Sequence, residues 1–212
     1  MRFKSSLISI TTALLMGASV AGGAVAGDMA PYDMTVSEAA AAIRDGNLTS
    51  VDLTESLLAR AEAGSGLNAF ITLDRDKALA AAKAADDARA NGGDLGPLHG
   101  VPLVIKDNIN TGDMPTTGGT PGLANHQPAA DAPVVARLRA AGAIILGKTN
   151  LHELAFGITS NNAHFGAVGN AYDPTTIAGG SSGGTGAAVA ARMAPGGLGT
   201  DTGGSVRIPP AL

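Results

Sequence analysis

The sequence contains no cysteine and no tryptophan, and aromatic residues make up only 3% of it. Without cysteine, disulfide bonds, thiol nucleophiles and thiolate metal sites are all excluded. With so few aromatic rings, the core must be built mainly from alanine, leucine, isoleucine and valine. Hydrophobic residues still reach 45% of the 212 residues and charged residues only 15%, so the composition indicates a folded domain rather than a disordered chain.

Histidine is also scarce, with four residues in the chain. None of them forms the H-E-x-x-H spacing of a helical zinc site, so the sequence predicts no metal centre. We interpret each histidine as a structural or exposed residue. These are His99, His126, His152 and His164.

The first 26 residues predict an export signal. Arg2 and Lys4 form a short basic start, an apolar stretch runs roughly from Leu7 to Val20, and Ala24-Val25-Ala26 is typical of a cleavage site. A membrane anchor or a buried first helix is the alternative interpretation, but the apolar stretch is short for a membrane span and contains Ser and Thr. We therefore expect a periplasmic or secreted protein with no stable membrane anchor after cleavage.

The charge of the remaining chain limits the classes of partner. Removing residues 1–26 takes away two of the 14 basic residues and none of the 18 acidic ones, which leaves a net charge of −6. Such a negative charge argues against nucleic acid or an anionic membrane surface as a partner.

Helix and strand signals alternate along the rest of the chain. Thr35-Val36-Ser37-Glu38 has the pattern of a capping box, Ser50 is a candidate cap for a second helix, and Asn150 with Glu153 suggests a later capped helix. Apolar runs between the helices suit buried strands, so the chain is predicted to be an α/β protein with helices packed on a sheet. Helices are expected at residues 35–46, from 50, at 74–91, 133–141, 150–156 and 186–193, and strands at 67–73, 101–106 and 143–146.

Residues 179–209 combine a high density of glycine with three serines. An Ala- and Val-rich stretch interrupts the glycines, which argues against a flexible linker. No GK[ST] follows the glycines, the G-x-G-x-x-G pattern is broken, and Ser205 lacks the second glycine of G-x-S-x-G. What remains is a serine in a Gly-rich turn, and a serine hydroxyl needs a neighbouring base to become a nucleophile.

Lys106 is the candidate base because it ends the apolar run Val101–Ile105. Partial burial would lower its pKa towards the neutral, basic form. From spacing alone, a surface lysine at the end of a strand remains an open alternative.

Two blocks of the sequence resemble the amidase-signature family. Residues 98–108, LHGVPLVIKDN, resemble the lysine block of that family, and residues 179–209 resemble its signature block over the whole length. The resemblance extends to residues 147–150 and 165–168 and covers nearly all of the chain after residue 26. It implies an amidase-signature α/β/α fold with a mixed central sheet, of which residues 27–212 would be the N-terminal part, truncated after the nucleophile.

The resemblance also implies a catalytic triad. Ser205 would be the nucleophile and Lys106 would be the base. Ser181 would sit on a non-proline cis peptide bond and would relay the proton between them. No metal or organic cofactor is implied.

The turn around the nucleophile is assigned in the same way. The backbone N–H groups of Thr202, Gly203, Gly204 and Ser205 would form the oxyanion hole. We expect three further residues to support the site rather than to perform chemistry, with the two charged ones as an ion pair. They are Ser182, Asp201 and Arg207.

The implied function is hydrolysis of the C–N bond of a small carboxamide through an acyl-enzyme, by a chain that could form a homodimer. Residues 153–162, ELAFGITSNN, look closest to indoleacetamide and mandelamide hydrolases, which act on aryl-substituted amides. The family also contains the cytoplasmic A subunit of tRNA-dependent amidotransferase, which usually has R-Q-P where this chain has Arg207-Ile208-Pro209. Because full members are roughly twice as long, a truncated, non-catalytic remnant is a further alternative.

Overall fold

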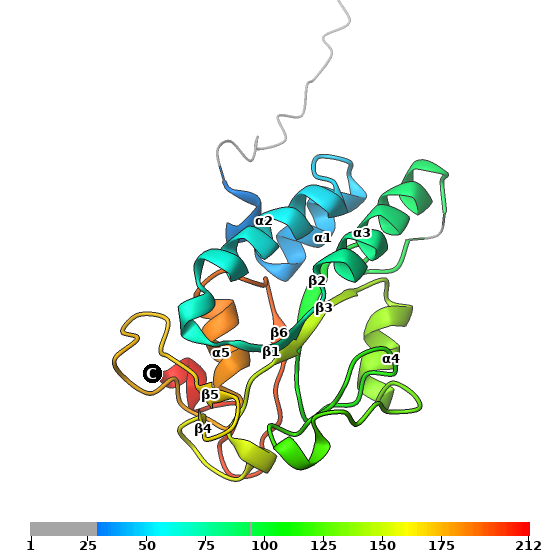
Figure 1. Cartoon of the computed structure of the whole chain (residues 1–212). Helices are drawn as coiled ribbons and strands as arrows, with labels where there is room; N and C mark the ends of the chain where they lie inside the picture. The colour runs from blue at the N-terminus through cyan, green and yellow to red at the C-terminus, as the bar shows by residue number, and fades with distance from the viewer. Residues whose placement is uncertain (1–28, 94) are drawn as a thin grey trace, which may run out of the picture.

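A computed structural model describes residues 29–93 and 95–212, which form a mixed sheet with helices packed against it (Figure 1). The predicted export signal at residues 1–26 lies outside the described residues. Within the described ranges, no helix is both long enough and apolar enough to cross a bilayer.

The central sheet has four strands in the order β1-β3-β2-β6. Strand β2 (Pro102–Lys106) runs parallel to its neighbours β3 (Ile144–Thr149) and β6 (Gly197–Leu198), whereas β1 (Phe70–Leu73) is antiparallel to β3. Every residue of β2 and β3 is buried, as expected for strands covered on both faces. The predicted α/β class and mixed sheet are therefore confirmed. A separate hairpin joins β4 (Asn161–Asn162) and β5 (Gly166–Ala167).

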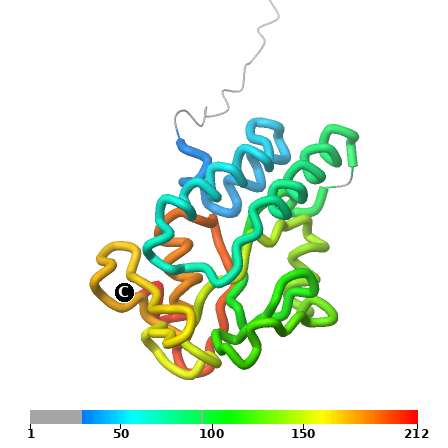
Figure 2. The backbone as a smooth tube through the Cα atoms, in the orientation of Figure 1, coloured from blue at the N-terminus to red at the C-terminus, as the bar shows by residue number. Residues whose placement is uncertain are grey.

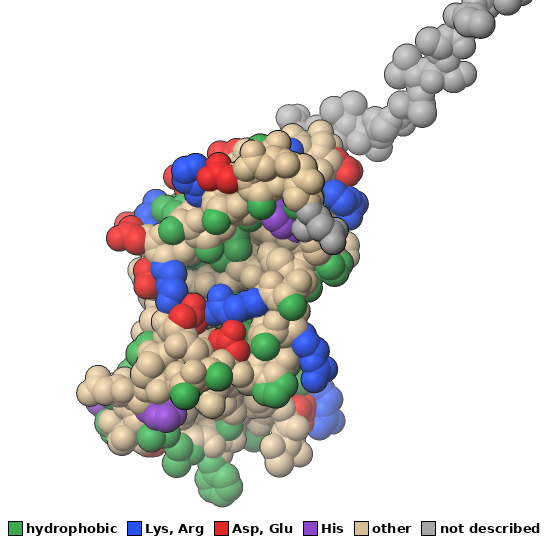
Figure 3. All heavy atoms as spheres, turned by 90° about the vertical axis from the view of Figure 1, so that its right-hand side faces the viewer, with side chains coloured by type: hydrophobic (Ala, Val, Ile, Leu, Met, Phe, Trp, Pro, Cys, Tyr) green, Lys and Arg blue, Asp and Glu red, His purple; other side chains and the backbone are tan. Residues whose placement is uncertain are grey.

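Helices cover both faces of the sheet (Figure 1). Helices α1 (Val36–Arg44), α2 (Ser50–Ala63), α3 (Arg75–Ala90) and α5 (Gly183–Ala190) contribute to one large hydrophobic cluster, together with Val104 and Leu146 of the sheet. Helix α4 (Pro133–Ala140) packs through Val135 against Ile105 and Ile145, which point to the other face. On the face of the molecule turned to the viewer in Figure 3, basic and acidic side chains lie side by side. Arg139 pairs with both Asp113 and Asp131.

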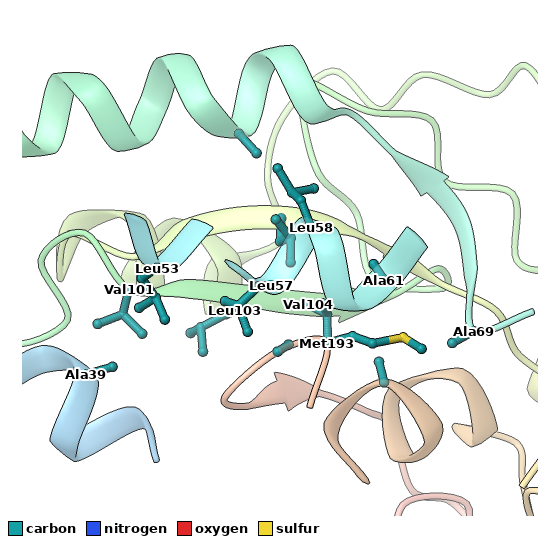
Figure 4. Packing of buried hydrophobic residues seen from close by; sticks show 14 of the residues in the cluster. Ala39, Leu53, Leu57, Leu58, Ala61, Ala69, Val101, Leu103, Val104 and Met193 are labelled. Atoms are coloured by element: carbon teal, nitrogen blue, oxygen red, sulfur yellow. The ribbon is translucent and has the colours of Figure 1, made fainter. Parts of the chain in front are cut away.

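The centre of the core lies between α2 and β2 (Figure 4). The apolar positions of α2 recur at helical spacing and contact the strand from above, while Met193 fills the space below it. Burying one such leucine contributes about 2 kcal/mol of transfer free energy. The labelled side chains of this layer are Leu53, Leu57, Leu58, Ala61, Val101, Leu103, Val104 and Met193.

Two helix-cap predictions are wrong because the side chains have distant partners. The cap of α2 is Thr49, whose hydroxyl accepts from Asp52 N at 2.9 Å, while Ser50 Oγ donates to Gly100 O at 2.6 Å. Asn150 caps no helix: its Nδ2 donates to Asn68 O and to Gly166 O, and only the short 3-10 turn Glu153–Ala155 follows.

Two other element boundaries differ from the prediction. The first strand begins at Phe70, not at residue 67, because Leu67 ends a 3-10 turn and Asn68 has a left-handed conformation with φ 53°. The helix expected at residues 186–193 is α5 (Gly183–Ala190), which begins a turn earlier, where Ser160 Oγ accepts from Gly183 N at 3.0 Å.

The first turn of α5 touches the backbone of the sheet at Gly184. Its N–H donates to Asn150 O at 3.0 Å, and a Cβ at this position would overlap the carbonyl oxygens of Asn150 and Ala69. We expect Gly184→Ala to lower the free energy of unfolding by about 3 kcal/mol, because neither backbone segment can move away without breaking the sheet. Urea denaturation followed by far-ultraviolet circular dichroism measures this. Gly66→Ala is the control, since no described atom lies within 4 Å of its added Cβ, and equal stability of the two variants would contradict the prediction.

Candidate active site

Two of the predicted catalytic residues, Lys106 and Ser181, meet where the parallel strands end. Lys106 is the last residue of β2, Thr200 follows β6, and Ser181 precedes α5. Figure 2 shows the segments after residues 106, 150 and 198 gathered at the same end of the molecule, and His152 N donates to Ser181 O across them at 3.2 Å. The carboxyl edge of a parallel sheet is the usual place for a ligand site in α/β proteins.

Lys106 and Ser181 are in direct contact. Lys106 Nζ donates to Ser181 Oγ at 2.7 Å, and both residues are fully buried. The Gly180–Ser181 peptide bond is cis. The alternative that Lys106 is a surface lysine is therefore wrong.

Burial lowers the pKa of Lys106 from 10.5 to about 8, and the carboxylate of Asp201 partly opposes this decrease. Desolvation disfavours the charged ammonium, so a sizeable share of the amine is neutral near pH 8. A neutral amine in contact with a hydroxyl can accept a proton from it, which is the chemistry of a general base.

Ser205 is buried next to this pair but is not bonded to it. Its backbone carbonyl accepts from Ser182 N at 3.0 Å, which places it beside the residue that follows Ser181. Within residues 29–93 and 95–212, its hydroxyl makes no hydrogen bond to Ser181 or to Lys106. Hydrogen bonds of a catalytic serine are often long without substrate and tighten when substrate binds.

Asp201 organises the turn that carries Ser205. Its carboxylate accepts from Gly204 N at 2.7 Å and Val206 N at 3.2 Å, and from the Arg207 guanidinium at 3.0 and 3.1 Å. The pKa of the Asp201 carboxyl lies well below its usual range. The largest cause is the hydrogen bond from the Arg207 side chain, and the second is the hydrogen bond from the backbone N–H of Gly204. The structure thus places Asp201 and Arg207 as an ion pair at the turn.

The four backbone N–H groups assigned to an oxyanion hole differ in their availability. The Gly204 N–H is occupied by Asp201. In the part of the chain that the structure describes, the N–H groups of Thr202, Gly203 and Ser205 have no acceptor. Of the four donors, the described residues therefore engage only that of Gly204.

Comparison with known proteins identifies the family. The family profile described as Amidase matches residues 52–212. The chain belongs to the amidase family. The resemblance seen in the two sequence blocks is thereby confirmed.

Amidases and amidotransferase subunits are among its relatives. The A subunit of the glutamyl-tRNA(Gln) amidotransferase of Chloroflexus aurantiacus is 50% identical over 182 residues, which cover 85% of this chain and 37% of that protein. The solved peptide amidase of Stenotrophomonas maltophilia is 41% identical with a TM-score of 0.77, over 82% of this chain and 37% of that one. A solved bacterial aryl acylamidase is 32% identical with a TM-score of 0.80, over 84% and 37%. This member of the amidase family therefore spans a little over a third of the length of these relatives.

Sequence reasoning missed two residues of this candidate site, Thr200 and Asn108. Lys106 Nζ donates to Thr200 Oγ1 at 2.8 Å, and Asn108 Nδ2 donates to the same oxygen at 3.1 Å. Ser182, assigned a supporting role, bonds the Thr200 backbone: its Oγ accepts from Thr200 N at 3.3 Å and lies 3.2 Å from Thr200 O. Because no strand pattern marks β6, no signal in the sequence indicated that Thr200 lies beside Lys106.

A second buried lysine fixes the loop that follows Lys106 in this chain. Lys148 Nζ lies 2.9 Å from Asp107 Oδ1 and donates to Thr116 Oγ1 at 2.7 Å. The other oxygen of Asp107 accepts from the backbone and hydroxyl of Thr117. Burial lowers the pKa of Lys148, and Asp107 opposes the decrease. Both side chains are fully buried, so the pair ties β3 to the start of the loop.

Proposed function

We propose that this chain hydrolyses the C–N bond of a carboxamide, with Ser205 as nucleophile, Ser181 as proton relay and Lys106 as base. The observation that carries the proposal is the 2.7 Å contact between the buried amine of Lys106 and the hydroxyl of Ser181. The backbone bond between Ser182 and Ser205 keeps the nucleophile beside this pair. A serine activated by a base that is itself oriented by its surroundings is the general pattern of nucleophilic catalysis.

The proposed reaction has two halves that use the same three side chains. Ser205 Oγ attacks the amide carbon while its proton passes to Ser181, whose own proton passes to the neutral amine of Lys106. The N–H groups of Thr202, Gly203 and Ser205, which have no acceptor among the described residues, would stabilise the resulting oxyanion, each contributing about 3 kcal/mol. The proton then returns through Ser181 to the leaving nitrogen, the C–N bond breaks, and water releases the acyl group by the same route.

The segment of residues 152–158 supports an aryl-substituted amide as substrate. This segment is joined to the site by the bond from His152 N to Ser181 O. It carries three exposed apolar side chains, Leu154, Phe156 and Ile158, at 62%, 89% and 57% exposure. Exposed apolar side chains in a segment that is bonded to the site favour a ligand with an apolar group. The similarity to a solved aryl acylamidase points in the same direction.

The amide of glutamine is the second candidate substrate. Its support is the 50% identity to the A subunit of a glutamyl-tRNA(Gln) amidotransferase. Against it, Arg207-Ile208-Pro209 departs from the R-Q-P of that branch. We also propose, from residues 1–26 alone, that the protein is exported to the periplasm or secreted, which would separate it from cytoplasmic tRNA.

A substrate panel tests the proposal on the full chain. Ammonia release from phenylacetamide, indole-3-acetamide and glutamine would be measured, together with intact mass after incubation with an activated aryl ester. We expect the aryl amides to be hydrolysed faster than glutamine, and a single acyl adduct on Ser205. Hydrolysis of glutamine alone would favour the second candidate. A folded chain with no turnover and no adduct would overturn the proposal in favour of a non-catalytic remnant.

A further inference from the structure

We propose that Thr200 and Asn108 are positioning residues, which hold the amine of Lys106 so that its lone pair faces Ser181. This inference rests on the proposed function. Neither residue was assigned a role by the sequence, and neither is one of the three groups that would carry the proton.

The contacts of the amine define the first step of the argument. Among the described residues, Nζ of Lys106 has two hydrogen-bond partners, Ser181 Oγ at 2.7 Å and Thr200 Oγ1 at 2.8 Å. A neutral amine has two N–H groups and one lone pair. When one N–H donates to Thr200, the lone pair is left to accept the proton of Ser181. Without an acceptor at position 200, the amine can rotate and its lone pair loses this direction.

Thr200 is itself held from two sides. Asn108 Nδ2 donates to its hydroxyl oxygen at 3.1 Å, and Ser182 Oγ lies 3.2 to 3.3 Å from its backbone N and O. Asn108 lies two residues after Lys106 in the chain, so the end of β2 supplies the base and the turn after it supplies the group that fixes the acceptor of that base. A site held by its surrounding hydrogen bonds keeps reacting atoms within the narrow geometry that proton transfer needs.

The charged groups near the amine act differently from Thr200. The carboxylate of Asp201 raises the pKa of Lys106 through space, and Asp107 is engaged by Lys148 and Thr117. Among the described residues, no charged group makes a hydrogen bond to Lys106 Nζ. Thr200 is uncharged and its hydroxyl contacts the amine of Lys106 directly, so it sets the direction in which the amine lone pair points. As an acceptor it also favours the ammonium form.

The test is the pH dependence of acylation of Ser205 by an activated aryl ester, measured on the full chain from pH 5.5 to 10. In Thr200→Val we expect the plateau rate at high pH to fall roughly ten- to hundredfold, because the base is neutral but misdirected. We also expect the midpoint to move below that of the unchanged protein, because an acceptor for the ammonium is lost. Thr200→Ser should restore both values. Thr54→Val is the matched control, since the Thr54 hydroxyl is buried in α2 with no hydrogen-bond partner among the described residues.

Asn108→Ala supplies the second measurement and applies even if Thr200→Val fails to fold. We expect a smaller loss of plateau rate, and no further loss when it is combined with Thr200→Val, because Asn108 acts through Thr200. A Thr200→Val protein with the original plateau and midpoint would overturn the inference, as would additive losses in the double variant. If acylation of the unchanged chain depends on neither Ser205 nor Lys106, the proposed function fails and the inference with it. If it depends on both and Thr200→Val has no effect, only the inference fails.

Discussion

Replacing Ser205 with alanine is expected to remove amide hydrolysis almost completely, by a factor on the order of 10⁶. The hydroxyl is the proposed nucleophile, and Thr202, the other hydroxyl residue of the turn, is exposed rather than buried beside Ser181. Initial rates with an aryl amide, and the mass of the protein after exposure to an activated ester, measure the loss. Ser65→Ala is the matched control, since Ser65 is exposed in a 3-10 turn away from the site.

The same substitution separates loss of chemistry from loss of fold. Within the described residues, the Ser205 hydroxyl does not bond to its catalytic partners, and the structural contact of this residue is made by its backbone carbonyl with Ser182 N. The free energy of unfolding of Ser205→Ala should therefore equal that of the unchanged protein within about 0.5 kcal/mol. A stable variant that keeps more than a hundredth of the activity would exclude Ser205 as the nucleophile.

The proposed proton relay through Ser181 also predicts the effect of a second substitution. Ser181→Ala should also lose most of the activity, because the amine of Lys106 contacts Ser181 and not Ser205. When residues act as one unit, their losses do not add. The double variant should therefore be no slower than Ser205→Ala alone, and a multiplicative loss would show that Ser181 acts by another route.

The parts of the fold that were predictable from sequence are those governed by local patterns. Residues 101–106 and 143–146 read as buried strands because they are continuous apolar runs, and the capping box at Thr35 is present in the structure. These two signals depend on neighbouring residues and are visible without the tertiary structure. The contact of Lys106 with a serine hydroxyl was instead implied by the resemblance of two sequence blocks to the amidase-signature family.

The parts that were missed depend on contacts between distant residues. Strand β6 (Gly197–Leu198) is short and half glycine, so no strand pattern marks it, and it exists because it pairs with Val104 and Ile105 of β2. Asn150 was predicted to cap a helix, but its side-chain amide donates to the carbonyl oxygens of Asn68 and Gly166, which are distant in the sequence. Thr200 reaches Lys106 only because β6 and β2 run in parallel.

Replacing Lys106 with methionine is expected to remove activity and to raise stability at neutral pH. Loss of the base should lower the rate of acylation by about 10³-fold, since general bases contribute 10² to 10⁴. In the unchanged protein the rate should rise tenfold per pH unit below pH 8 and level off above it, because only the neutral amine accepts the proton and its pKa is about 8. The methionine variant should show no such rise. Stopped-flow acylation across pH 6 to 10 measures both.

The change in stability follows from the same pKa. A lysine whose pKa is about 8 when folded and 10.5 when unfolded destabilises the folded state by about 3 kcal/mol wherever both states are protonated, below pH 8. Between pH 8 and 10.5 the unfolded state binds more protons, so this destabilisation disappears as the pH rises. Methionine removes the destabilisation but also two hydrogen bonds, each of which contributes about 1 kcal/mol.

Lys106→Met should therefore be about 1 kcal/mol more stable than the unchanged protein at pH 7 and about 2 kcal/mol less stable at pH 10.5. Urea denaturation at the two pH values measures the crossing. Lys83→Met is the control, since Lys83 is exposed on α3 and pairs with Asp87, and its effect on stability should not change sign. A Lys106→Met protein that is less stable by the same amount at both pH values would show that the folded state does not disfavour the charged form of Lys106. The lowered pKa on which the proposed base depends would then be wrong.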